Sequence, residues 1–347
     1  MKRVLKHIVD NHYKNISVVG LSKNAGKTVA LNGLLEYFFE AGIRLGLTSS
    51  GRDGERKDVL TNTEKPGIFV VKGTLFSTTD ALYKKAKYPA EILYIGEEKT
   101  PLGRVLLARA MEDSFIEIAG LQSNSGLNFL CDKMISLGAN YCFIDGSINR
   151  QASASPQISD ACILSVGAAY SRSMDKTVEI AAHTVNMFRI KEVNSEIRKV
   201  LLPVFNKCCF IEEKEVKVIE QLTALNAGAN MAKEINSKTK YVYIPGALVF
   251  NTLESILKKN RLLKQCTIVV QDPTKIFLTP KEYLWVQKQG IEIQVFKEMK
   301  LLGVTINPYA PAGYFYNGNA FMEMLSKRIS MVPIYDIIRN EVIVNEV

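Results

Sequence analysis

Short apolar runs alternate along the first part of the chain with longer segments in which apolar positions recur at helical spacing. Such runs are typical of strands buried on both faces, and such segments are typical of amphipathic helices. The pattern predicts strands over 16–19, 43–49, 67–71, 92–95, 115–120, 140–147 and 160–168. It predicts helices over 2–13, 29–39, 77–87, 125–137 and 172–188, and a further helix that begins at Thr100-Pro101. Strands that alternate with helices indicate an α/β fold with a doubly wound, mostly parallel sheet.

The pattern weakens near residue 190 into charged helical sequence, and we place a domain boundary near residue 200. Beyond it, strand-like runs again alternate with helical segments, at 240–247, 267–271, 291–296 and 302–308. This second series predicts a smaller α/β unit. We therefore expect two domains, residues 1–200 and residues 201–347.

A glycine-bounded loop joins the first strand to the next helix and reads Gly-Leu-Ser-Lys-Asn-Ala-Gly-Lys-Thr over residues 20–28. Strand, loop and helix in this order are the setting of a phosphate-binding loop (P-loop). Gly26 lets the backbone approach a phosphate, which the helix N–H groups and dipole then face. Lys27 would reach the β- and γ-phosphates of ATP, and the Thr28 hydroxyl would join a Mg²⁺ shell. The predicted nucleotide-binding residues are Gly20, Ser22, Lys23, Asn24, Ala25, Gly26, Lys27, Thr28 and Val29.

Two acidic residues follow later strands. Asp145 and Gly146 close the apolar run that starts at Asn140, as in a Walker B strand, and Asp53 lies in the polar segment after the second strand. Because the carboxyl ends of parallel strands meet around the ligand, we expect Asp53 and Asp145 to hold Mg²⁺ with Thr28. The alternatives are a polar turn around Asp53 and a plain strand end at Asp145.

Arginines beside these carboxylates are candidates for stabilising charge during phosphoryl transfer. Arg52 lies next to Asp53, and Arg150 lies in the small, polar segment 148–160, which would suit a switch loop. The residues that we predict to take part in catalysis are Lys27, Arg52, Asp53 and Asp145.

The composition of the chain indicates what kind of protein contains this site. The chain has 347 residues, 47% apolar and 23% charged, as in ordinary globular proteins, and a net charge of +9 that suits nucleotide phosphates. The charge is spread out, so specific nucleic-acid binding is not expected. Six cysteines without a C-x-x-C pair and only three histidines predict buried thiols rather than a zinc site. Without a long apolar stretch or an apolar leader, we expect a cytoplasmic protein with no membrane association.

Counted from Gly20, the loop has the form G-x-x-x-x-x-G-K-T and resembles dethiobiotin synthetase and its relatives among the P-loop proteins of the MinD, ParA and signal-recognition class. Many of these proteins carry an extra lysine where this chain has Ser22. The adjacent Lys23 either reaches a phosphate, across a homodimer, or is a solvated loop lysine. An Asn at a strand end often hydrogen-bonds the base in this class, and Asn307-Pro308 fits either that role or a simple turn.

Several motifs together resemble the family of P-loop subunits of lysine 5,6-aminomutase reactivases. The motifs are residues 20–28, 51–54, 63–66, 100–104, 118–120 and Asp145-Gly146. This resemblance implies a MutS-like ATPase subunit as partner. Its client would be an adenosylcobalamin-dependent aminomutase that loses activity during turnover. Nucleotide binding or hydrolysis would then drive exchange of the damaged cofactor.

Two other functions remain open from the sequence. A ligase resembling dethiobiotin synthetase would phosphorylate a small carboxylate and would use Lys65, Lys23 and the 50–56 segment on its substrate. A nucleotide-binding regulator without turnover is the other, since Ser22 replaces the extra lysine and no glutamine or glutamate is clearly placed to activate water. The sequence does not decide between ATP and GTP, whether hydrolysis occurs, or the oligomeric state.

Overall fold

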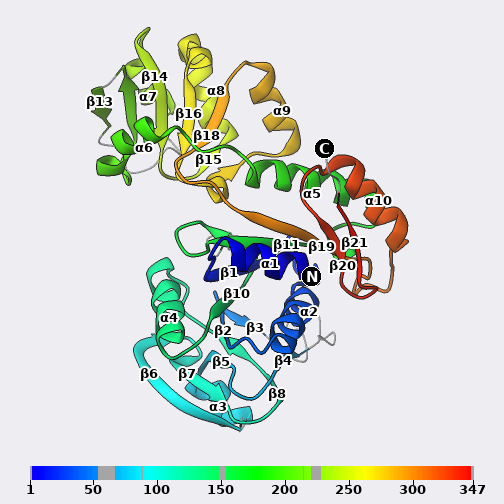
Figure 1. The fold of residues 1–347 in the computed structure, drawn as a ribbon. Coiled ribbons are helices and arrows are strands. Elements are labelled where there is room, and N and C mark those ends of the chain that lie inside the picture. Colours follow the sequence, from blue (N-terminus) through cyan, green and yellow to red (C-terminus); the bar gives the residue numbers. More distant parts are fainter. Residues whose placement is uncertain are drawn as a thin grey trace. The chain divides into compact units, whose positions relative to one another are not determined.

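The computed structural model describes residues 2–53, 67–86, 89–147, 154–213, 215–219 and 228–344. The chain divides into two units, the first formed by Met1–Ala182 with Lys300–Val347 and the second by His183–Met299 (Figure 1). This division differs from the predicted boundary near residue 200, which assigned the whole remainder of the chain to the second domain. The difference arises because the chain from Lys300 onward returns to the sheet of the first unit.

A ten-stranded sheet lies at the centre of the described part of the first unit, in the order β21-β20-β19-β11-β1-β10-β2-β5-β7-β6. Its strands are β1 (Asn15–Gly20), β2 (Leu45–Ser49), β5 (Leu75–Thr79), β6 (Ala90–Thr100), β7 (Gly103–Ala110), β10 (Tyr141–Ser147), β11 (Ala161–Gly167), β19 (Leu301–Asn307), β20 (Ile334–Asp336) and β21 (Glu341–Ile343). Strands from β20 to β5 are parallel, whereas β21, β7 and β6 run antiparallel to their neighbours. The predicted α/β fold with a large, mostly parallel sheet is confirmed.

Helices cover both faces of this sheet. Helices α1 (Lys2–Asp10) and α2 (Lys27–Glu40) share one apolar core with the sheet, in which the Phe38 ring of α2 meets the Phe143 ring of β10 at 5.2 Å. Helix α4 (Asn124–Ser136) packs on the opposite face, against Cys142 and Ile144 of the same strand. Because side chains alternate along a strand, the continuous apolar run of β10 supplies both cores.

The remaining elements of the first unit are short or lie outside the large sheet. They are α3 (Asp80–Ala86), α10 (Gly318–Arg328) and two strand pairs, β3 (Arg52–Asp53) with β9 (Ile118–Ala119) and β4 (Ile68–Val70) with β8 (Ser114–Ile116). Helix α5 (Met174–Phe188) begins in the first unit and continues into the second, which starts at His183. The strand predicted over 115–120 is therefore wrong as a single strand, since it is divided between β8 and β9. Neither part joins the large sheet.

The helix predicted from Thr100-Pro101 is also wrong, because Thr100 is the last residue of β6 and Pro101 lies in the turn that leads to β7. Gly103 there has a φ of 99°, which a helix does not accommodate, and the Thr100 hydroxyl donates to the Gly103 carbonyl at 2.9 Å. Arg104 faces Asp80, with Nε 3.7 Å from the carboxylate, so an intramolecular ion pair accounts for its charge.

The second unit is a smaller α/β unit around a five-stranded sheet. In sheet order its strands are β13 (Glu215–Val218), β12 (Cys209–Glu212), β14 (Thr239–Ile244), β16 (Thr267–Val270) and β18 (Glu292–Val295). The shorter elements are α6 (Ser195–Leu201), α7 (Gly228–Glu234), α8 (Phe250–Lys259), α9 (Pro280–Lys288) and the pair β15 (Leu248–Val249) and β17 (Ile276–Phe277). The run predicted at 302–308 is β19, which belongs to the first unit. Within the described residues of the two units, none of the helices combines the length and apolarity needed to cross a membrane.

Candidate functional site

The glycine-bounded loop connects the carboxyl end of β1 to the amino end of α2. Leu21 leaves the strand with its N–H donated to the Ser165 carbonyl of β11 at 2.8 Å. Asn24 and Gly26 adopt left-handed backbone angles, with φ of 61° and 95°, which turn the chain tightly into the helix. The stem of Lys27 packs back over Gly20, where a Cβ atom would lie 2.9 Å from Lys27 Cγ. The side chain of Lys27, at the helical end of the loop, therefore lies against Gly20, at the strand end.

The amino end of α2 is an electropositive site. Its N-cap is Gly26, which has no side chain to accept hydrogen bonds from the first N–H groups of the helix. The first turn contains no acidic residue and begins with Lys27 and Thr28, both half-buried. A lysine at a helix amino end opposes the helix dipole, so this arrangement favours a bound anion over an empty site.

The carboxyl ends of two other strands, β11 and β19, contact the loop. A Cβ atom on Gly167, at the end of β11, would lie 2.8 Å from Ala25 Cα. A Cβ atom on Gly26 would lie 2.7 Å from the Cβ of Asn307, the last residue of β19. The loop thus rests on the ends of β11 and β19, and its backbone position depends on small or fixed side chains there.

Asp145 lies in β10, beside the strand that leads into the loop. It pairs in register with Val18 of β1 and Ser49 of β2, and its side chain is fully buried. By strand alternation it faces the same side as Phe143, which packs against α2. It is also two residues nearer the carboxyl end of the strand, toward the loop. A fully buried aspartate is uncommon and indicates a polar or ionic role.

The structure describes the side chains of only some of the other predicted site residues. The Ser22 hydroxyl donates to the Lys23 carbonyl at 3.2 Å, and the Lys23 side chain is exposed. Arg52 and Asp53 form strand β3, but their side chains lie outside what the structure describes, as do Lys65 and Arg150. The structure therefore places residues 20–28 at the end of β1 and Asp145 in the adjacent strand β10, in register with Val18.

Several residues near the loop were not singled out from the sequence. Ser49 lies beside Asp145 in β2 and accepts the Gly51 N–H at 3.2 Å, while the Thr305 hydroxyl donates to Ser165 at 2.9 Å. The sequence could have indicated these residues, because they are polar positions within otherwise apolar strand runs. Buried polar side chains need hydrogen-bond partners and are uncommon in buried strands.

The cysteines play no part in this site. All six thiols are buried, as predicted. Cys142 and Cys162 lie in β10 and β11, and burial raises the pKa of both thiols, helped at Cys142 by Cys131 3.1 Å away. Thiols that stay protonated are poor nucleophiles and poor metal ligands. Across the described residues no group of three or more His, Cys, Asp or Glu is placed to hold a metal ion.

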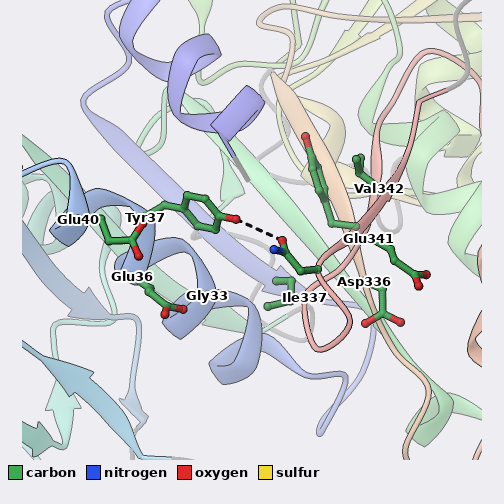
Figure 2. A pocket seen from close by; sticks show the side chains of 10 residues that line it. Gly33, Glu36, Tyr37, Glu40, Asp336, Ile337, Glu341 and Val342 are labelled. Atoms are coloured by element: carbon green, nitrogen blue, oxygen red, sulfur yellow. Dashed lines mark hydrogen bonds between the residues drawn. The ribbon is translucent and has the colours of Figure 1, made fainter.

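A separate groove of about 290 Å³ lies further along α2, against the hairpin of β20 and β21 (Figure 2). Its lining includes Glu36, Glu40, Asp336 and Glu341, and the Tyr37 hydroxyl spans it to the Asn340 side chain at 3.2 Å. Arg339 already pairs with Asp336 and Glu341, at 2.7 and 3.2 Å. Arg339 offsets only part of the charge of these four carboxylates, so the groove disfavours a phosphate and does not extend the loop site.

Comparisons of the chain with protein-family models, with curated proteins and with solved structures found no match in any of the three. The functional assignment consequently depends on the geometry of the loop and its surroundings.

Proposed function

We propose that the chain is a P-loop protein that binds Mg-ATP at residues 20–28 and hydrolyses it. The observation that carries this proposal is the uncapped amino end of α2, which begins with Lys27 and Thr28 behind a left-handed Gly26. The phosphates of a nucleotide would accept hydrogen bonds from the first N–H groups of α2, which no side chain caps, and would be favoured by the helix dipole. The formal net charge of +9 is in keeping with such a ligand.

Each residue has a defined role in this proposal. The N–H groups of the first turn of α2 hold the phosphates, and Lys27 neutralises their charge. Thr28 and Asp145 hold Mg²⁺, Thr28 directly and Asp145 directly or through water, since both offer oxygen atoms on the same face of the sheet. Bound Mg²⁺ supplies charge neutralisation to the transferring phosphoryl group. Arg52 and Asp53 complete the proposed set as in the sequence prediction.

The family resemblance extends the proposal to a biological role. In it, the protein acts with a MutS-like ATPase subunit as the reactivase of an adenosylcobalamin-dependent lysine 5,6-aminomutase. Binding or hydrolysis of ATP shifts the population between two conformations, one of which releases the damaged cofactor. In this proposal the partner binds the second unit, which is a separate α/β unit, and the complex acts in the cytoplasm.

The test is steady-state phosphate release from the purified protein with Mg-ATP, alone and with the aminomutase and the MutS-like subunit. We expect release that the partners stimulate and that Lys27→Ala abolishes. Lys84→Ala, which removes an exposed lysine from α3, is the matched control and should release phosphate like the wild type.

The same assay separates the other candidate functions. Phosphate release that depends on a small carboxylate and does not change when either partner is added would indicate a ligase resembling dethiobiotin synthetase. Binding of Mg-ATP without release under any of these conditions would indicate a regulator. Release that survives Lys27→Ala would contradict the proposed site altogether.

A further inference from the structure

The segment after β19 is an ordered hairpin rather than a loose connection. It runs from Pro308 to Asn317, before α10. The Tyr316 N–H donates to the Pro308 carbonyl at 2.9 Å and the Ala310 N–H to the Tyr314 carbonyl at 3.0 Å. These bonds place Tyr309 directly opposite Phe315. The aromatic residues of this segment are therefore held in a fixed arrangement.

Alternate aromatic residues in the hairpin point inward and outward. The hydroxyl of Tyr314 donates to the Ala168 carbonyl at 2.8 Å, and that of Tyr316 donates to the Ser171 carbonyl. The Arg172 guanidinium lies 5.4 Å from the centre of the Tyr314 ring. These contacts fasten the hairpin to the segment that follows β11.

Tyr309 and Phe315, on the outward side, form an exposed pair. Their side chains are 57% and 71% exposed, and their rings lie 6.4 Å apart with an angle of 42° between them. Single exposed apolar side chains are normal, but two adjacent rings on a fixed hairpin forgo the stabilisation that burial of a large aromatic provides. The two rings stabilise the hairpin as a cross-strand pair, and their exposed faces also leave room for a planar ligand to stack.

The hairpin adjoins the phosphate-binding loop at both of its attachments. Asn307, which lies against Gly26, accepts the Tyr309 N–H at 3.2 Å. Ala168, which holds Tyr314, directly follows Gly167, the glycine that lies against Ala25. The exposed rings therefore belong to the same edge of the sheet as the loop, on the β11 and β19 side, whereas Asp145 lies on the β10 side.

We infer that Tyr309 and Phe315 form the stacking platform for the base of the nucleotide whose phosphates residues 20–28 hold, an inference that rests on the proposed function. Stacking on aromatic side chains stabilises any base, because every base presents a π-face, and larger faces gain more. The platform therefore selects purine nucleotides over pyrimidine nucleotides without deciding between adenine and guanine.

The experiment is calorimetric titration with Mg-ATP and with Mg-tripolyphosphate, which has no base. We expect Phe315→Leu to weaken ATP affinity about tenfold, in line with ~1–3 kcal/mol per stacked base, and to leave tripolyphosphate affinity unchanged. Phe315→Trp keeps an aromatic face and should restore ATP affinity. Phe129→Ala, which removes an exposed ring from α4, is the control and should bind both ligands like the wild type.

The outcomes separate the two levels of the proposal. Equal ATP affinity in the wild type and a Tyr309→Ala, Phe315→Leu double variant would overturn the platform while leaving the phosphate site intact. So would equal affinities of the wild type for ATP, CTP and UTP. If the wild type binds neither ATP nor tripolyphosphate, the proposed function fails and the platform fails with it. If Phe315→Leu weakens both ligands equally, Phe315 supports the loop and does not stack on a base.

Discussion

Asn307 of β19 lies so close to Gly26, in the loop of residues 20–28, that a Cβ atom added at residue 26 would lie 2.7 Å from the Cβ of Asn307. The two residues are far apart in sequence, and the contact fixes the loop against the carboxyl end of a strand that enters the sheet only near the end of the chain. The amino end of α2 is therefore positioned by tertiary packing as well as by its own glycines.

Gly26→Ala should therefore disable the loop. The substitution places a side chain in a left-handed conformation, which costs roughly 1–2 kcal/mol, and also pushes the loop away from Asn307. We expect loss of measurable ATP binding in calorimetry. Gly42→Ala is the matched control, because Gly42 has a φ of 68° with nothing within 4 Å of a Cβ atom. It should lower the free energy of unfolding while binding ATP normally; normal binding by Gly26→Ala would contradict this account.

Gly33→Ala should destabilise the protein even though Gly33 lies inside α2. In a helix interior this change usually stabilises by ~1 kcal/mol. Here the new Cβ would clash with Ile337 Cγ2, so the hairpin of β20 and β21 must shift. Thermal unfolding should show a lower midpoint for Gly33→Ala than for the wild type. The loss of unfolding free energy caused by Gly33→Ala should be smaller when Ile337→Ala is already present. Additive effects in this double-mutant cycle would show that the two residues do not contact.

Asp145→Asn should separate magnesium binding from nucleotide binding. The amide keeps the size of the side chain but cannot hold Mg²⁺ as a carboxylate does. We expect phosphate release to fall at least about tenfold, since one lost ionic contact is worth ~1.5–3 kcal/mol. The stimulation of ATP binding by Mg²⁺ should also disappear. Asp132→Asn, at an exposed position of α4, should change neither quantity. An unaltered Mg²⁺ dependence in Asp145→Asn would remove Asp145 from the site.

The six thiols should resist alkylation in the native protein. Burial raises the pKa of Cys209 to about 12 and that of Cys266 to about 11, from an ordinary value of 9.0. Raised thiol pKa values mean that the folded state binds more protons, so this contribution to stability is complete below pH 9 and is lost as the pH rises through 11 and 12. Iodoacetamide at pH 8, followed by mass spectrometry, should label six cysteines in urea and none in buffer. Rapid labelling of any native thiol would contradict the buried positions.

The sequence predicted the strand, loop and helix around residues 20–28 because each depends on local chemistry. Buried parallel strands appear as continuous apolar runs, which identified β1, β10 and β11, and Gly26 supplies the turn before Lys27. Asp145 was recognisable because it ends such a run.

Other features depend on contacts that a local pattern does not encode. The run at 302–308 was correctly predicted as a strand, but nothing in it shows that β19 joins the first sheet between β11 and β20. Thr100-Pro101 fits the start of a helix as well as it fits a turn, and the left-handed Gly103 decides for the turn. The exposure of Phe315 was likewise hidden, since the aromatic residues on either side of it anchor the hairpin.

The most direct test of a phosphate site at the amino end of α2 is a calorimetric titration of the wild type, Lys27→Ala and Lys84→Ala with Mg-ATP. We predict saturable binding by the wild type and by Lys84→Ala, and an affinity at least about tenfold weaker for Lys27→Ala, as expected when a charge-assisted contact is lost. Equal affinities in all three proteins, or no binding by the wild type, would contradict the site.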